Sequence, residues 1–203
     1  MSFFPHLFLA LLEGTLAAAT LALTALGLSL VFGVMRVVNV AHGELYMLGA
    51  MIAWWASRLV PSLPLAGFLL ALVLAPLAVG AVAFATERLL LRRINYDPEA
   101  TIVATIGLLF VIQQLALSVF GAEAKPVAAP FTYRVVFPWF GYSGYKLFVI
   151  AASAGLLVLT WWVLSRTRFG LIMRVTQFDR ETATAFGIPV GKVYAAVFTV
   201  GAM

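Results

Sequence analysis

The amino-acid sequence predicts an all-α protein, a polytopic bundle of transmembrane helices, and three observations lead to this prediction. Hydrophobic residues make up 64% of the 203 residues and charged residues only 10%, whereas soluble domains are about half apolar and about a quarter charged. The mean hydropathy is +1.06. The apolar residues also gather into separate runs of about 20 residues, the length that a helix needs to cross a bilayer.

Five apolar runs and the start of a sixth divide the chain. The second run has the right length for a crossing but holds His42 and Glu44. The sixth run ends after covering only about half the hydrocarbon thickness at 1.5 Å per residue. We therefore expect a single transmembrane domain over residues 1–203 that is truncated at its C-terminal end. The six runs are residues 14–35, 37–57, 59–86, 100–122, 146–165 and 193–203.

Lysine and arginine are unevenly distributed between the loops, and this pattern predicts the orientation of the helices. Basic residues gather in 87–93 and 166–192, which two apolar runs separate, so both stretches lie on one side of the membrane. Short cytoplasmic loops are enriched in Lys and Arg, and we expect this side to be cytoplasmic. The N-terminus is then extracytoplasmic. The net charge of +5 follows from this topology, and no motif indicates nucleic-acid binding.

Polar residues interrupt the second apolar run. Asn39, His42 and Glu44 lie within six residues of one another, and ionisable groups inside a membrane are costly and commonly functional. Gly43 tolerates a break in regular helix, and broken helices form the substrate sites of many transporters. We interpret 39–44 as a helix break that lines a transport pathway. The alternatives are pairing with neighbours that only fixes helix packing, and a position at the cytoplasmic interface.

Two other runs contain residues of interest. The first run is rich in small residues, including Gly27, which predicts close packing against other helices. The fourth run holds Thr101, Thr105 and Gln113. Threonine hydroxyls commonly bond back to their own helix, whereas Gln113 faces either a pathway or a neighbouring helix.

A short helix is predicted inside the second basic stretch. Asp179 is a good N-cap, and Glu181 suits the first turn of the helix. Gly187 is a typical helix stop, so Arg180 and Ala183 fall inside the helix. A short exposed cytoplasmic helix of this kind is either a docking element for a soluble partner or a helix that lies on the membrane surface.

Several chemistries are excluded by the sequence. The stretch 187–192 resembles a phosphate-binding loop but has three residues between its glycines and no Ser or Thr after the Lys, so we expect no ATP binding by this chain. The Gly-x-Ser-Gly run at 141–144 resembles a protease motif but lies in a loop rich in Pro and aromatic residues. The absence of cysteine excludes thiolate metal sites, and we expect neither a metal nor a cofactor.

Three stretches carry a resemblance to a known family. The most specific is the Asn-x-Ala-His-Gly-Glu run at 39–44, which follows an apolar segment at 25–33 that contains Gly27 and Gly33. Thr101 to Gly107 with Gln113 is the second stretch, and 167–188 is the third. The chain resembles the permease subunits of branched-chain amino acid ABC importers of the LivH type, a family that also includes importers of urea and short amides.

The resemblance implies a non-enzymatic transport subunit in the bacterial cytoplasmic membrane. Its implied partners are a second homologous permease, two cytoplasmic ATPase subunits, and a periplasmic or lipid-anchored substrate-binding protein, besides membrane lipid. It also implies that 179–187 is the coupling helix which docks on the ATPase. The alternatives are a permease of a sugar or nucleoside ABC class and an ATP-independent channel or carrier. The chain departs from the family pattern in its looser 93–98 loop and in Val40, where Phe is common.

Overall fold

The computed structural model describes residues 3–127 and 129–203, and helices account for most of them, which confirms the predicted all-α fold. A short antiparallel hairpin lies in the long loop before the fifth helix. In chain order the elements are α1 (Phe3–Met35), α2 (His42–Ser57), α3 (Pro64–Thr86), the π-helical turn η1 (Glu87–Leu91), α4 (Pro98–Phe120), β1 (Arg134–Val136), β2 (Gly141–Ser143), α5 (Gly144–Arg166), α6 (Arg168–Phe178), α7 (Arg180–Ala185) and α8 (Val190–Ala202).

Four helices of the described chain are long and apolar enough to cross a membrane: α1, α3 together with η1, α4, and α5. The predicted run 37–57 is different, because the chain is not helical between Met35 and His42. The 16 residues of α2 extend about 24 Å at 1.5 Å per residue, which is less than the roughly 30 Å of hydrocarbon. The run therefore consists of a non-helical stretch followed by a short helix.

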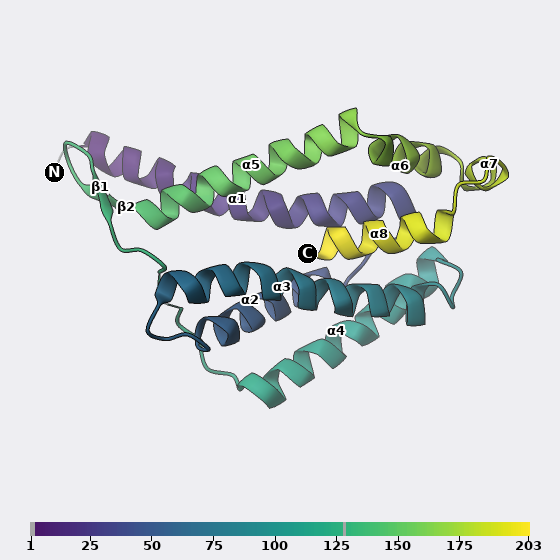
Figure 1. Ribbon diagram of the computed structural model, residues 1–203, viewed down its shortest axis with the longest axis horizontal. Coiled ribbons are helices and arrows are strands. Elements are labelled where there is room, and N and C mark those ends of the chain that lie inside the picture. Colours follow the sequence, from purple (N-terminus) through teal and green to yellow (C-terminus); the bar gives the residue numbers. More distant parts are fainter. Residues whose placement is uncertain (1–2, 128) are drawn as a thin grey trace.

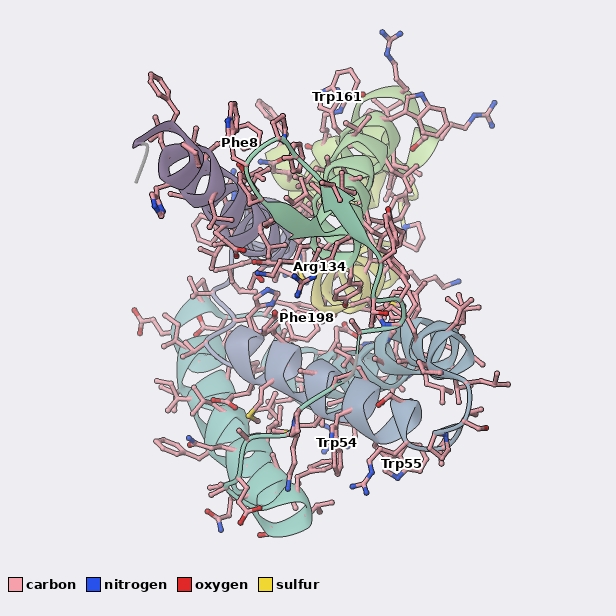
Figure 2. All side chains as sticks on the ribbon, turned by 90° about the vertical axis from the view of Figure 1, so that its left-hand side faces the viewer. Phe8, Trp54, Trp55, Arg134, Trp161 and Phe198 are labelled. Carbon is pink, nitrogen blue, oxygen red and sulfur yellow. The ribbon has the colours of Figure 1, made fainter. Side chains whose placement is uncertain are left out.

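The helices form two groups with α8 between them (Figure 1). α1 and α5 lie side by side in one group, and α2, α3 and α4 form the other. α8 packs against α1 on one side and against α3 on the other. Phe198 of α8 is 1% exposed and lies between the two groups in the end-on view of Figure 2. Packing against α8 therefore holds the two groups together.

The two ends of the bundle differ in charge and aromatic content. The turn 87–97 lies at the same end as α6 and α7, so both basic stretches face one side, as the sequence predicted (Figure 1). The opposite end carries the N-terminus and the hairpin. Aromatic residues are typical of membrane interfaces, and edge-to-face or tilted pairs at this end join Phe8 with Phe137 and Phe140, Phe68 with Tyr145 and Phe148, and Trp54 with Phe120.

Candidate functional site

The chain leaves regular helix between α1 and α2, and two residues shape the turn there. Arg36 has a positive φ of 55°, a conformation that residues other than glycine adopt uncommonly. The side-chain Oδ1 of Asn39 accepts a hydrogen bond from the N–H of Ala41 at 3.1 Å, and its carbonyl oxygen accepts one from the N–H of His42 at 3.3 Å. Asn39 is buried, so it satisfies polar backbone groups that lipid could not.

His42 is the first residue of α2, and its ring is buried against α1. Nε2 of His42 lies 3.0 Å from the carbonyl oxygen of Thr24. A carbonyl oxygen only accepts, so Nε2 carries the hydrogen and Nδ1 holds a lone pair in the neutral ring. Nδ1 is buried and has no hydrogen-bond partner among the described residues. It is therefore an acceptor for a water molecule or for a solute that brings an N–H group.

Two glycines let α1 and α8 approach closely beside His42. A Cβ atom on Gly27 would overlap the carbonyl oxygen of Gly201 and would lie 3.1 Å from Cε1 of the His42 ring. A Cβ atom on Gly201 would lie 2.8 Å from Cγ2 of Val31. Small residues permit such backbone contacts between membrane helices, so the packing role predicted for Gly27 is confirmed.

Gly43 and Glu44 lie in the first turn of α2, and the helix continues through both of them. The helix break predicted over 39–44 is present at 39–41, but the prediction was wrong for 42–44, because α2 begins at His42. Gly43 is exposed, and a Cβ atom there would meet nothing within 4 Å. Glu44 is half-buried and makes no ion pair within the described part of the chain. An acidic residue in a first turn interacts favourably with the helix dipole.

Gln113 lies on an exposed face of α4, so the structure does not bring it together with the buried His42. The α4 residue that does contact the break is Thr105, whose Oγ1 accepts from the N–H of Val40 at 3.2 Å. The same hydroxyl donates to the carbonyl oxygen of Thr101 at 2.8 Å, as expected for threonine in a helix. Its second bond joins residues 65 positions apart, and no local sequence signal predicts it.

The predicted short helix is present as α7, and both of its caps are confirmed. Oδ1 of Asp179 accepts from the N–H groups of Glu181 at 2.9 Å and Thr182 at 3.2 Å. The Thr182 hydroxyl donates to the other carboxylate oxygen and holds the pKa of Asp179 below its ordinary value. Gly187 has φ +79°, and Ala183, fully buried, accepts through its carbonyl oxygen from the N–H of Ile188 at 3.0 Å.

The surface around α7 is apolar and uncovered. Phe178 at the end of α6 is 89% exposed, and Phe186 after α7 is 80% exposed. A groove of about 380 Å³ lies between α6 and α7, lined by Leu171, Arg174, Val175, Phe178, Asp179 and Thr182. Exposed aromatic side chains beside a groove are typical of a protein–protein contact.

Comparison with known proteins identifies relatives of the chain. Residues 10–203 match the family described as "Branched-chain amino acid transport system / permease component". The high-affinity branched-chain amino acid transport system permease protein BraD of Pseudomonas aeruginosa is 27% identical over 97% of this chain and 67% of its own length. LivH of Salmonella typhimurium is 23% identical over 94% and 65% of the two chains, and a probable LivH of Methanocaldococcus jannaschii is 26% identical over 90% and 59%.

The chain spans about two thirds of the length of the curated relatives it matches. No solved structure matches it. The family match includes both segments described above, 39–44 and 179–187, and the four span-length helices are those of a multi-pass membrane protein. The chain therefore belongs to the family of permease components of branched-chain amino acid transport systems.

Proposed function

We propose that this chain is a permease subunit of an ABC importer that moves branched-chain amino acids across the bacterial cytoplasmic membrane. The family match over residues 10–203 and the four span-length helices support this role. The relatives named above are described as permease proteins of branched-chain amino acid transport. ATP hydrolysis on partner subunits supplies the energy, and the chain supplies the path and its gate.

The path of the solute runs past the start of α2. The buried Nδ1 of His42 is an acceptor without a partner in the described chain, and the ammonium group of an amino acid is a donor that fits it. Asn39 fixes the turn that presents His42. Gly43 and Glu44 follow in the same first turn, with Gly43 leaving its side of the helix open. Urea and short amides also carry N–H donors, so they are the alternative substrates.

A second, homologous permease subunit completes the path. Gln113 is exposed on α4, a helix of membrane-spanning length. An amide side chain that faces lipid without a hydrogen-bond partner is unfavourable. We therefore place the exposed face around Gln113 against the path or against the second subunit, which one chain alone does not enclose.

The helix α7 is the docking element for the ATPase subunits, and its geometry is the observation that carries this part of the proposal. Asp179 and Gly187 cap the helix at its two ends, and the buried Ala183 fixes it to the bundle. Glu181 and the two exposed phenylalanines surround the face that the ATPase contacts. A periplasmic or lipid-anchored binding protein delivers the solute at the opposite, aromatic end.

Affinity purification of the chain from native membranes tests the proposal. We expect two ATPases and a second permease to accompany it, and vesicles holding the complex to accumulate labelled leucine only when ATP is present. Leucine accumulation without ATP, or recovery of well-folded chain alone, would overturn the proposal in favour of an ATP-independent channel or carrier. Accumulation of labelled urea instead of leucine would keep the ABC importer and correct the substrate.

A further inference from the structure

A buried carboxylate lies at the basic end of the bundle, apart from the start of α2. Glu87 is 2% exposed and is the first residue of the π-helical turn that continues α3. The hydroxyl of Tyr96 donates to Oε1 of Glu87 at 2.5 Å. Hydrogen bonds to carboxylates are short and strong, and a buried carboxylate requires such a partner. Tyr96 precedes α4 by two residues, so this bond ties the end of α3 to the start of α4.

The ring of Tyr96 continues the contact to α8. It packs edge-to-face against Tyr194 with the ring centroids 4.8 Å apart, and both residues are buried. Burial, together with the hydrogen bond to Glu87, raises the pKa of Tyr96, so the hydroxyl keeps its proton at neutral pH. Tyr194 takes part in this contact through its ring, whereas the hydrogen bond to Glu87 comes from the hydroxyl of Tyr96.

Arg180 joins α7 to this pair of rings. Its guanidinium lies 5.5 Å from the ring centre of Tyr96 and 5.8 Å from that of Tyr194. Arginine is attracted to the face of an aromatic ring through its charge and its planar group. The side chain of Arg180 therefore turns back toward the bundle, although the sequence alone places it with the residues that contact the ATPase.

The backbone around these side chains has unusual conformations. Asn95 and Tyr96 are consecutive residues with φ of 55° and 58°, and Glu87 begins a π-helical turn. Residues other than glycine keep such φ values only where their surroundings fix them. Single π-helical turns are frequent at functional sites. The contacts of Tyr96 supply the fixation here.

We propose that Glu87, Tyr96, Tyr194 and Arg180 form a positioning unit that makes α7 move together with the cytoplasmic ends of α3, α4 and α8. The inference rests on the proposed function, in which α7 docks on the ATPase. Tyr194 and Gly201 are seven residues apart on α8, about 10 Å along its axis. Gly201 contacts Gly27 beside His42, so α8 carries a displacement of α7 to the start of α2.

A matched pair of substitutions tests the unit in the reconstituted importer. Tyr96→Phe and Tyr194→Phe each remove one hydroxyl, but only that of Tyr96 donates to Glu87. We expect Tyr96→Phe to lower the leucine imported per ATP hydrolysed about ten-fold, the factor expected for loss of a hydrogen bond to a charged group. Tyr194→Phe should retain the ratio of the unaltered chain, and the ATPases should co-purify with both variants.

A second pair tests Arg180. Arg180→Gln should lower the same ratio about two- to five-fold, the factor that corresponds to a partly exposed cation–π contact. Arg180→Lys should restore part of it, because an ammonium group also binds ring faces. Arg168→Gln removes the same charge from exposed Arg168 at the start of α6 and should leave the ratio unchanged.

A distance measurement between two spin labels tests the variants whose transport is too low to measure. The chain has no cysteine, so Thr184→Cys and Arg93→Cys, both at exposed positions, accept spin labels selectively. We expect the distance distribution between the labels to broaden with Tyr96→Phe and Arg180→Gln but not with Tyr194→Phe or Arg168→Gln.

The outcomes separate the two proposals. If the unaltered chain binds no ATPase and imports no leucine, the proposed function fails. If it does both, while Tyr96→Phe matches Tyr194→Phe and Arg180→Gln matches Arg168→Gln in coupling ratio and in label distance, the positioning unit is overturned and the importer stands.

Discussion

The turn before α2 and the N-cap of α7 both rely on a side-chain oxygen that accepts from the backbone, but in opposite surroundings. Asn39 and Asp179 each use a side-chain oxygen to accept backbone N–H groups within the next three residues. Asn39 is 3% exposed and is covered by other helices, whereas Asp179 is exposed at the end of the bundle. The turn at Asn39 is therefore stabilised by the helices that cover it, whereas the turn at Asp179 is stabilised mainly by hydrogen bonds to the residues that follow it in sequence.

This difference separates tertiary from local control of structure. In the turn before α2, the N–H of Val40 donates to the hydroxyl of Thr105 on α4. The ring of His42, which follows the turn, lies beside the close contact between α1 and α8. The turn before α7 depends on hydrogen bonds between neighbours in sequence. Substitutions near the first turn should consequently lower the stability of the whole bundle, and those near the second should change its stability less.

The largest effect on stability is expected from Gly27→Ala. The added Cβ would overlap the backbone of Gly201, which cannot rotate away as a side chain would. Overpacking in a tight core costs about 1–3 kcal/mol, and we place this substitution at the upper end. Thermal unfolding in detergent should show a large fall in Tm, with Gly14→Ala as the control, since a Cβ at Gly14 meets nothing within 4 Å. Equal Tm values for the two variants would contradict close α1–α8 packing.

A moderate effect is expected from Thr105→Val. The substitution keeps the shape of the side chain but leaves the N–H of Val40 without its acceptor. An unsatisfied buried amide costs about 1–3 kcal/mol, and because this hydrogen bond is only partly buried we place the loss at the lower end. Thr160→Val is the matched control, because the hydroxyl of half-buried Thr160 bonds only to the carbonyl oxygen of Leu156 in its own helix. Denaturant unfolding of both variants checks the prediction. A loss no larger for Thr105→Val would mean that the bond to α4 does not hold the turn.

A smaller and local effect is expected from Gly187→Val. Gly187 has φ +79°, and a left-handed conformation costs about 1–2 kcal/mol for a residue with a Cβ. The end of α7 should change, and co-purification of the ATPases should weaken while Tm stays close to that of the unaltered chain. Gly191→Val is the control, because Gly191 lies in α8 with open space around it. Undiminished recovery of the ATPases would remove Gly187 from the docking element.

The same contrast explains how far the sequence could be interpreted. The caps of α7 were predictable, because Asp179 and Gly187 act on their own neighbours and each has a strong local preference. The break before α2 was placed too late, because glycine at 43 suggested flexibility whereas Asn39 and a hydrogen bond from 65 positions away fix the turn. Likewise the bond between Glu87 and Tyr96 was not predicted, since nothing local indicates that this carboxylate is buried.

The smallest effect on stability is expected from Glu44→Gln. This substitution tests whether the start of α2 takes part in transport or only in helix packing. Half-buried Glu44 has no ion-pair partner in the described chain, so the substitution removes only its interaction with the helix dipole, about 0.3–1 kcal/mol. Glu99→Gln is the matched control, because Glu99 also lies in a first turn, that of α4.

Both variants should insert into the membrane with nearly unchanged Tm. If Glu44 faces the solute path, leucine uptake should fall for Glu44→Gln alone. Because each substitution removes one negative charge from the first turn of a helix, a selective loss of uptake cannot come from the dipole alone. Normal uptake with Glu44→Gln would leave Asn39 and His42 as structural residues that fix the turn, and the path would then have to run along another face of the bundle.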